Sequence, residues 1–240
     1  SFFILSIFII SCKGEDSVQV DEDGIITGLQ TKTFLHDNVN RNYLTYIPDS
    51  YDSEIDYPLI FLFHGFGGIA SQFINTADMR DLAESNNFIV VYPQGLDLNG
   101  TGSHWNCSNP SADNKSDVDD IGFIENLIDQ LIVDYPVIDS KRIYAAGYSN
   151  GGFMSYYLAC NSKKFAAIGS VAGTMLDDSY QSCNANFPTA MINIHGTNDF
   201  DVPYDGNTYY PSIPEVVDWW KNFNNTPNED LLTNQDGSIE

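Results

Sequence analysis

The chain has 240 residues, 42% hydrophobic and 18% charged, a composition that supports one sizeable folded core. Acidic residues outnumber basic ones 33 to 10, and the formal net charge of -23 argues against binding to nucleic acid or to anionic lipid. Aromatic residues make up 13% of the chain, which excludes a largely disordered protein.

The N-terminal segment has the pattern of an export signal. The apolar run at positions 2–10 is too short to span a membrane and suits the hydrophobic region of a signal peptide. Cys12 follows a small residue and precedes a lysine, an order that resembles a bacterial lipoprotein signal. We expect an export signal over residues 1–11, lipidation of Cys12 and an extracellular or outer-membrane location. A plain secretory signal and a buried N-terminal strand are the alternatives.

Short apolar runs and segments of helical spacing alternate along the rest of the chain. Residues 12–30 are acidic and are expected to form a tether before a domain that begins near Thr31. Strands are predicted over 31–36, 42–47, 58–63, 88–92, 142–147, 165–171 and 189–195. Helices are predicted over 76–86, 121–132, 151–159 and 214–223. The alternation predicts a single α/β domain over 31–240, with a mostly parallel sheet and helices on both faces.

Three aspartates stand at the start of the helix predicted over 121–132. Asp117, Asp119 and Asp120 would lie near the positive end of the helix dipole. Their expected role is to cap this helix end.

A glycine-flanked serine lies between a predicted strand and a predicted helix. The segment 147–151 reads G-x-S-x-G, with Ser149 at its centre and Gly152 next to it. A nucleophile elbow needs a strand, a sharp turn and a helix in this order, because the turn strains the serine backbone and a side chain at either flanking glycine would crowd it. The sequence therefore predicts Ser149 as a catalytic nucleophile, the alternative being an ordinary turn with a capping serine.

A second glycine-dense segment follows an earlier buried strand. Acyl transfer needs two backbone N–H groups directed at the developing oxyanion. One should come from Asn150, directly after the nucleophile, and the other from the segment 64–68, which reads H-G-x-G-G. Phe66 is the chosen donor and Gly67 the alternative. His64 is interpreted as a residue that braces this loop.

A third segment, 195–204, follows the strand predicted over 189–195. An acid at the carboxyl end of a strand after the nucleophile is expected to orient the catalytic histidine. Asp199 and Asp201 both satisfy this position. A loop aspartate can instead form an Asx-turn, an interpretation that suits Asp201.

These three segments, in this order, resemble those of the polyhydroxybutyrate depolymerase and feruloyl esterase family of α/β-hydrolases. The resemblance covers most of residues 42–223 and includes the segments 43–48, 92–95, 105–106, 119–123 and 158–160. It implies an α/β-hydrolase fold, Ser149 as nucleophile and Asp199, in preference to Asp201, as the triad acid. It also implies that Trp105 lines the acyl or alcohol pocket. It implies no metal and no organic cofactor.

The catalytic base is where the sequence departs from this pattern. In the family the histidine follows one further strand after the acid, whereas every histidine here precedes Asp199: His36, His64, His104 and His195. His195 is interpreted as structural, and His104 would give an unusual triad order. We expect the last strand, the histidine loop and the last helix to lie beyond residue 240, the alternative being an inactive protein of this length.

The remaining cysteines predict one disulfide. Cys160 ends a predicted helix and Cys183 lies in the following loop, so they are the preferred pair, which leaves Cys107 over. No Cys/His spacing indicates a zinc site.

The sequence as a whole predicts an exported serine carboxylesterase, expected to be a monomer. Its substrate would be an ester of feruloyl or acetyl groups on a polysaccharide, or a short polyester. A serine peptidase of the same fold and an inactive glycan-binding protein are the alternatives.

Overall fold

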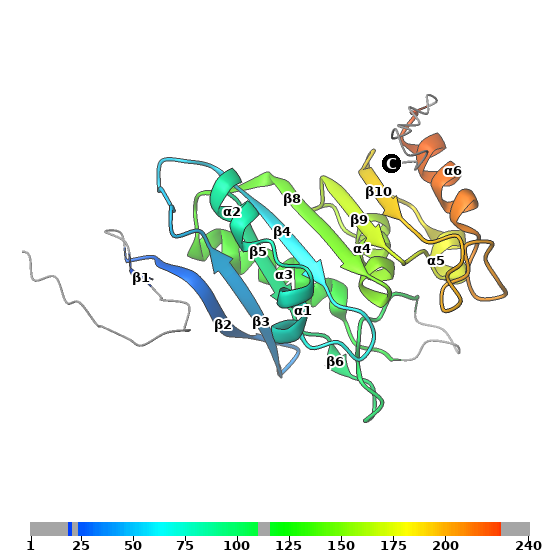
Figure 1. The fold of residues 1–240 in the computed structure, drawn as a ribbon, viewed down its shortest axis with the longest axis horizontal. Helices are drawn as coiled ribbons and strands as arrows, with labels where there is room; N and C mark the ends of the chain where they lie inside the picture. The colour runs from blue at the N-terminus through cyan, green and yellow to red at the C-terminus, as the bar shows by residue number, and fades with distance from the viewer. Residues whose placement is uncertain (1–18, 21–23, 110–115, 227–240) are drawn as a thin grey trace, which may run out of the picture.

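An eight-stranded sheet forms the centre of the protein in a computed structural model of the chain, which describes residues 19–20, 24–109 and 116–226 (Figure 1). The export signal expected over 1–11 and the lipidation site Cys12 lie outside the described residues. The strand order is β1-β2-β3-β5-β4-β8-β9-β10. These strands are β1 (Gln19–Val20), β2 (Ile26–His36), β3 (Val39–Ile47), β4 (Tyr57–Phe63), β5 (Ile89–Pro93), β8 (Ile138–Tyr148), β9 (Ala167–Val171) and β10 (Ala190–Ile194).

The five strands from β5 to β10 in this order run parallel, and the β1-β2-β3 edge is antiparallel. Two further short strands, β6 (Leu96–Asp97) and β7 (Ser103–His104), pair in the long loop after β5. The prediction of a mostly parallel sheet is confirmed.

Helices cover both faces of the sheet, as the sequence predicts. On one face α1 (Ala70–Thr76) and α2 (Arg80–Asn86) pack on Leu62 and its neighbours. On the other face Phe61 and Phe63 belong to the larger core, because successive residues of a strand point to opposite sides. That core is covered by α3 (Asp120–Asp134), α4 (Asn150–Asn161) and α6 (Ile213–Phe223), and α5 (Asp177–Ser182) lies beside it.

The first hairpin begins earlier and turns more tightly than predicted. β2 starts at Ile26, so the domain boundary expected near Thr31 is too late by several residues. Asp37 and Asn38 alone form the turn, with positive φ values of 48° and 61°. Two such residues match the right-handed twist of the flanking strands, and Asp and Asn tolerate this conformation.

The helix predicted over 76–86 is confirmed only over 80–86, as α2; an unpredicted helix, α1, ends at Thr76, and residues 77–79 separate the two. The hydroxyl of Tyr92 enters this break, donating to the Ala77 carbonyl at 2.7 Å and accepting from the Met79 amide at 3.2 Å. A buried tyrosine from the sheet therefore takes the backbone groups that a continuous helix would have paired internally. Spacing alone predicted the apolar face of this segment but not its interruption.

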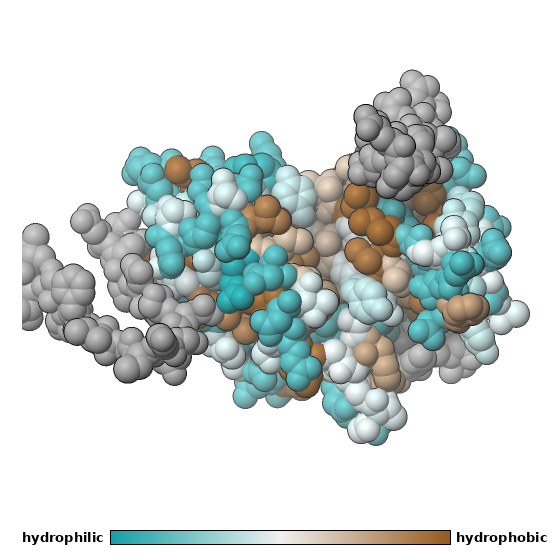
Figure 2. Space-filling view, viewed as in Figure 1, coloured by the Kyte–Doolittle hydropathy of each residue, from teal (hydrophilic) through white to brown (hydrophobic). Residues whose placement is uncertain are grey.

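On the face of the sheet that α1 and α2 cover, no helix in the described part of the chain covers β9 and β10. Ile192 and Ile194 are 60% and 55% exposed, and Val171 is also exposed. Figure 2 shows hydrophobic surface on this part of the molecule, beyond the helices that cover β5 and β4. This exposed apolar surface thus includes the strand that precedes the loop of Asp199.

The predicted disulfide joins Cys160 to Cys183, from the end of α4 to the end of α5. Cys107 is buried and makes no disulfide, and its thiol donates to the Trp105 carbonyl at 3.2 Å. None of the helices in the described part of the chain is long and apolar enough to cross a membrane.

Candidate active site

Ser149 occupies a sharp turn between β8 and α4, as the sequence predicts. Its φ and ψ are 51° and -119°, a backbone conformation that a non-glycine residue rarely adopts and that carries strain. Its amide donates to the Val171 carbonyl at 2.8 Å, which ties the turn to β9. The serine is half-buried and directly follows the carboxyl end of β8.

The glycines of the motif allow the backbones of β4, β8 and α4 to approach one another closely at this turn. A Cβ at Gly151 would lie 2.1 Å from the Phe63 carbonyl oxygen of β4, and one at Gly147 would lie 2.2 Å from the Gly151 carbonyl. A Cβ at Gly152 would meet the Ser170 hydroxyl at 2.4 Å. No side chain fits at these positions, so the glycine pattern is a direct requirement of the close packing of α4 on the sheet.

His64 braces the loop after β4, as its sequence position suggested. Its side chain is buried; Nε2 accepts from the Gly95 amide at 3.0 Å, and Nδ1 donates to the Gly65 carbonyl at 2.7 Å. Burial lowers the pKa of His64, although the bond to Gly65 acts in the opposite direction. The imidazole is therefore neutral and fixed in one tautomer, and its role is structural.

The braced loop passes directly beside the nucleophile. A Cβ on Gly65 would lie 3.4 Å from Ser149 Cβ. The Gly67 amide donates to the Ser103 carbonyl at 2.7 Å, so it is already occupied. Among the described residues, the amides of Phe66 and Asn150 make no hydrogen bond. The structure thus leaves unpaired the two amides predicted for the oxyanion hole, and their catalytic role remains a prediction.

Trp105 lies in the core and not at an open surface. Its exposed fraction is 1%, its ring packs edge-on against Phe63, and Nε1 donates to the His64 carbonyl at 3.0 Å. The Asn150 side chain accepts from the Trp105 amide at 2.7 Å and donates to the Trp105 carbonyl at 3.0 Å. In this structure Trp105 therefore holds two loops against the elbow, and pocket lining remains a prediction from the resemblance alone.

Asp199 follows β10 on the same edge of the sheet as Ser149. Tyr148, Val171 and Ile194 are in register across β8, β9 and β10, so the loops that carry Ser149 and Asp199 leave the sheet at one level. Oδ1 of Asp199 accepts from the amides of Asp201 and Val202, both at 2.9 Å. The Asx-turn expected for Asp201 is therefore formed by Asp199, whose Oδ2 makes no hydrogen bond among the described residues.

The described histidines do not contact the Ser149 hydroxyl. The His195 side chain is 1% exposed, and its Nε2 donates to the Val202 carbonyl at 2.8 Å and lies 3.6 Å from Asp199 Oδ2. This placement agrees with its interpretation as structural. His104 donates through Nδ1 to the Leu96 carbonyl at 3.1 Å, and its Nε2 is 2.8 Å from the Ser116 hydroxyl. Both ring nitrogens of His104 thus make hydrogen bonds to residues outside the nucleophile elbow.

A buried ion pair that the sequence did not reveal supports this region. Asp119 caps α3 as predicted, accepting from the Gly122 amide at 2.8 Å. Asp120 was predicted as a second cap but is fully buried, where Oδ1 contacts the Arg41 guanidinium at 2.5 Å and Oδ2 accepts from the Asn106 amide at 2.8 Å. The pairing joins β3 to the loop that carries Trp105, a long-range contact that no local pattern encodes.

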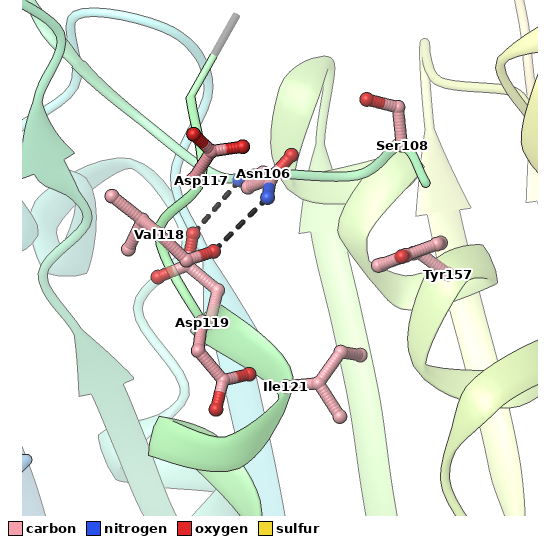
Figure 3. A pocket seen from close by; sticks show the side chains of 8 residues that line it. Asn106, Ser108, Asp117, Val118, Asp119, Ile121 and Tyr157 are labelled. Atoms are coloured by element: carbon pink, nitrogen blue, oxygen red, sulfur yellow. Dashed lines mark hydrogen bonds between the residues drawn. The ribbon is translucent and has the colours of Figure 1, made fainter. Parts of the chain in front are cut away.

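A cavity of about 270 Å³ lies beside the start of α3. Figure 3 shows that the aspartates and Asn106 surround it from one side and Tyr157 of α4 from the other. Ser149 does not line this cavity. The predicted nucleophile and this cavity therefore lie at different places on the protein.

Comparisons with known proteins give relatives along most of the chain. The prolyl oligopeptidase family model matches residues 76–183. A probable feruloyl esterase C of Aspergillus niger is 31% identical over 179 residues, which are 72% of this chain and 60% of the relative. The probable feruloyl esterase C of Aspergillus terreus is 34% identical over 177 residues, 70% of this chain and 59% of the relative. The chain thus spans about 60% of the length of these relatives.

Solved structures of several hydrolases share the fold. A thermostable esterase has a TM-score of 0.63 at 17% identity, covering 85% of this chain and 59% of its own. An acylaminoacyl peptidase has a TM-score of 0.59 at 16% identity, covering 81% of this chain and 35% of its own. An acetyl xylan esterase of Aspergillus awamori has a TM-score of 0.52 at 21% identity, covering 66% and 57%. At these identities the similarity concerns the fold, which confirms the predicted α/β-hydrolase architecture.

The buried neutral His64 predicts a pH dependence of stability. Its pKa is lowered below the ordinary value of 6.5, so under mild acid the unfolded chain takes up a proton that the folded chain does not. Stability should fall as the pH drops below 6.5, by up to about 1.4 kcal/mol per pH unit from this residue. His64→Gln should be less stable at pH 8 but show a shallower slope between pH 6.5 and 5. Urea titrations at several pH values measure both slopes, and equal slopes would contradict the assignment.

Proposed function

Because the chain is similar to feruloyl esterases over about 60% of their length and has an α/β-hydrolase fold, we propose that it is a serine carboxylesterase of that family with Ser149 as its nucleophile. The observation that carries this proposal is the strained elbow, in which Ser149 has a φ of 51° between β8 and α4. Strain of this kind persists only where the surrounding structure enforces it, and such positions cluster at active sites. An ordinary capping serine needs no such conformation, and Ser149 makes no side-chain capping bond to α4.

The proposed reaction is acyl transfer through a covalent intermediate. Ser149 Oγ attacks the ester carbonyl while a histidine takes the hydroxyl proton, and the alcohol leaves with that proton. The amides of Phe66 and Asn150 stabilise the oxyanion, which is supported by their lack of other acceptors and by the occupied amide of Gly67. Water then attacks the acyl-enzyme, releasing the acid and restoring the serine.

We place the catalytic histidine beyond residue 240, with Asp199 as the residue that orients it. Asp199 has one carboxylate oxygen tied to its own loop and Oδ2 without a hydrogen bond among the described residues. The loop of Asp199 adjoins the open face of β10, where Ile192 and Ile194 are exposed. A further segment that packs there would cover this apolar surface and bring its histidine between Asp199 and Ser149.

The proposed substrates are feruloyl or acetyl esters on a polysaccharide, with short polyesters as a less supported class. The relatives named feruloyl esterase support the first class. Exposed aromatic side chains flank the elbow as well: Phe66 is 52% exposed and Tyr148 is 51% exposed. Such faces suit stacking on an aromatic acyl group. The net charge of -23 fits a neutral polymer better than an acidic one.

A serine peptidase activity is the second candidate, since the prolyl oligopeptidase family model matches residues 76–183 and an acylaminoacyl peptidase shares the fold. Both activities would use the same elbow, so they are separated by substrate. Methyl ferulate and p-nitrophenyl acetate report the esterase, and an N-acylated aminoacyl p-nitroanilide reports the peptidase. An inactive glycan-binding protein would hydrolyse none of these.

We also propose that the protein is exported and works as a monomer outside the cell. The apolar run at 2–10 and the disulfide between Cys160 and Cys183 support export to an oxidising compartment. Lipidation of Cys12 would anchor the protein to a membrane surface.

Ser149→Ala in the full-length protein should lower kcat/KM for methyl ferulate by at least about 10³-fold, because the acyl-enzyme can no longer form. Alanine keeps the Cβ that Ser149 already carries at this strained turn, so the fold should be retained. Thermal melting checks the fold and steady-state kinetics check the activity. Turnover close to that of the wild type would contradict the nucleophile assignment.

Asp199→Asn should lower kcat by about 10⁴-fold, because the amide no longer holds the catalytic imidazole in the required tautomer. Asp201→Asn is the matched control, with the same charge change in the same loop and an exposed side chain. It should retain most of the activity. The opposite ranking of the two variants would move the triad acid to Asp201.

A further inference from the structure

Three side chains from two distant parts of the sequence meet beside the first hairpin. His36 ends β2, Asp37 begins the turn to β3, and Asp119 precedes α3. Nε2 of His36 lies 3.6 Å from Asp37 Oδ2 and 3.5 Å from Asp119 Oδ2. All three ligand-type atoms lie within 4.8 Å of one another. The sequence pattern does not reveal this group, because its members come together only when the end of β2 packs against the start of α3.

The histidine of this group is buried and has a nitrogen without a hydrogen bond. The His36 side chain is 8% exposed, and Nε2 is a buried atom with no hydrogen-bond partner among the described residues. Nδ1 faces the Asn126 amide at 3.3 Å. Rotating that amide by 180° lets its oxygen accept the Nδ1 proton, and this tautomer leaves the Nε2 lone pair directed at the two carboxylates. A buried polar atom in this position calls for a partner.

The spacing of these atoms fits ligands that share one metal ion. Separations of 3.5 and 3.6 Å are long for hydrogen bonds. Two nitrogen or oxygen ligands at about 2.0–2.2 Å from a tetrahedral zinc ion are about 3.3–3.6 Å apart. We propose that His36, Asp37 and Asp119 bind a divalent transition-metal cation of the zinc class.

Asp119 is held in the orientation that this site requires. Its Oδ1 accepts from the Gly122 amide at 2.8 Å, which leaves Oδ2 to face His36. A Cβ on residue 122 would lie 2.1 Å from Oδ2, so glycine at that position leaves the room that this carboxylate occupies. Helix capping and metal binding therefore use different oxygens of one side chain, an arrangement typical of ligands fixed by an outer hydrogen bond.

The charges at the site also favour a cation. The two carboxylates carry the negative charge of the site, and no lysine or arginine in the described part of the chain pairs with Asp37 or Asp119. The carboxylates are 74% and 53% exposed, so water can complete the coordination. A bound ion would join the β2–β3 hairpin to α3, next to the buried pair of Arg41 and Asp120. Its role would be structural, since Ser149 is not part of the group.

The test is titration of the metal-free full-length protein with ZnCl₂ at pH 7.5, by calorimetry and by thermal melting. The wild type should bind one Zn²⁺ saturably, and a hundredfold excess of free metal over Kd should raise Tm by about 5–10 °C. Asp37→Asn and Asp119→Asn should each weaken binding by at least about tenfold. Both variants should fold, because asparagine tolerates the turn conformation of residue 37 and is a good helix cap at residue 119.

Asp81→Asn, an exposed position on α2, is the matched control and should bind Zn²⁺ as the wild type does. If Zn²⁺ merely condenses on the acidic surface, all three variants will weaken binding equally, because each removes one negative charge. That result overturns the proposal. It is also overturned if the wild type shows no saturable binding. Neither outcome bears on ester hydrolysis, because Ser149 and Asp199 are unchanged in every variant.

Discussion

The close approach of α4 to the ends of β8 and β4 is the constraint on which the rest of the structure depends. A side chain at Gly151 would collide with the Phe63 carbonyl, and one at Gly147 would collide with Gly151 itself. Because the helix starts so near the sheet, the chain must reverse within a single residue. Ser149 is that residue, and its positive φ follows from the packing. The strain at Ser149 that would support catalysis is thus produced by the close packing of α4 on β8 and β4, which the glycines of the motif permit.

A network of buried polar contacts holds the neighbouring loops against this turn. His64 ties the loop after β4 to Gly95, Trp105 donates to the His64 carbonyl, and Asn150 joins the Trp105 backbone to the start of α4. The Arg41–Asp120 pair extends the network to the antiparallel edge of the sheet. Apart from Arg41 Nε, which has no hydrogen-bond partner among the described residues, these groups are paired within the protein, so the loops are positioned by fixed bonds and not by apolar packing alone. Preorganised amides beside the nucleophile are what an oxyanion-stabilising site requires.

Features that depend on local pattern could be predicted from the sequence. The buried strands, the helix at 120–134, the serine elbow and the Cys160–Cys183 pair follow from apolar runs, periodicity and short motifs. Features made by long-range contacts could not. The helix break at 77–79 depends on the hydroxyl of Tyr92, and the burial of Asp120 depends on Arg41 from another strand. The burial of Trp105 likewise follows from its contact with His64 and not from its neighbours in sequence.

Covalent labelling of the full-length protein by a small fluorophosphonate tests the central claim most directly. An activated serine displaces fluoride from phosphorus and keeps the phosphonyl group, and peptide mass spectrometry locates it. Labelling confined to Ser149, with parallel loss of methyl ferulate hydrolysis, is the result expected if the strained elbow carries the nucleophile. An active protein that is labelled at another residue, or not labelled while it still hydrolyses the ester, would contradict the account.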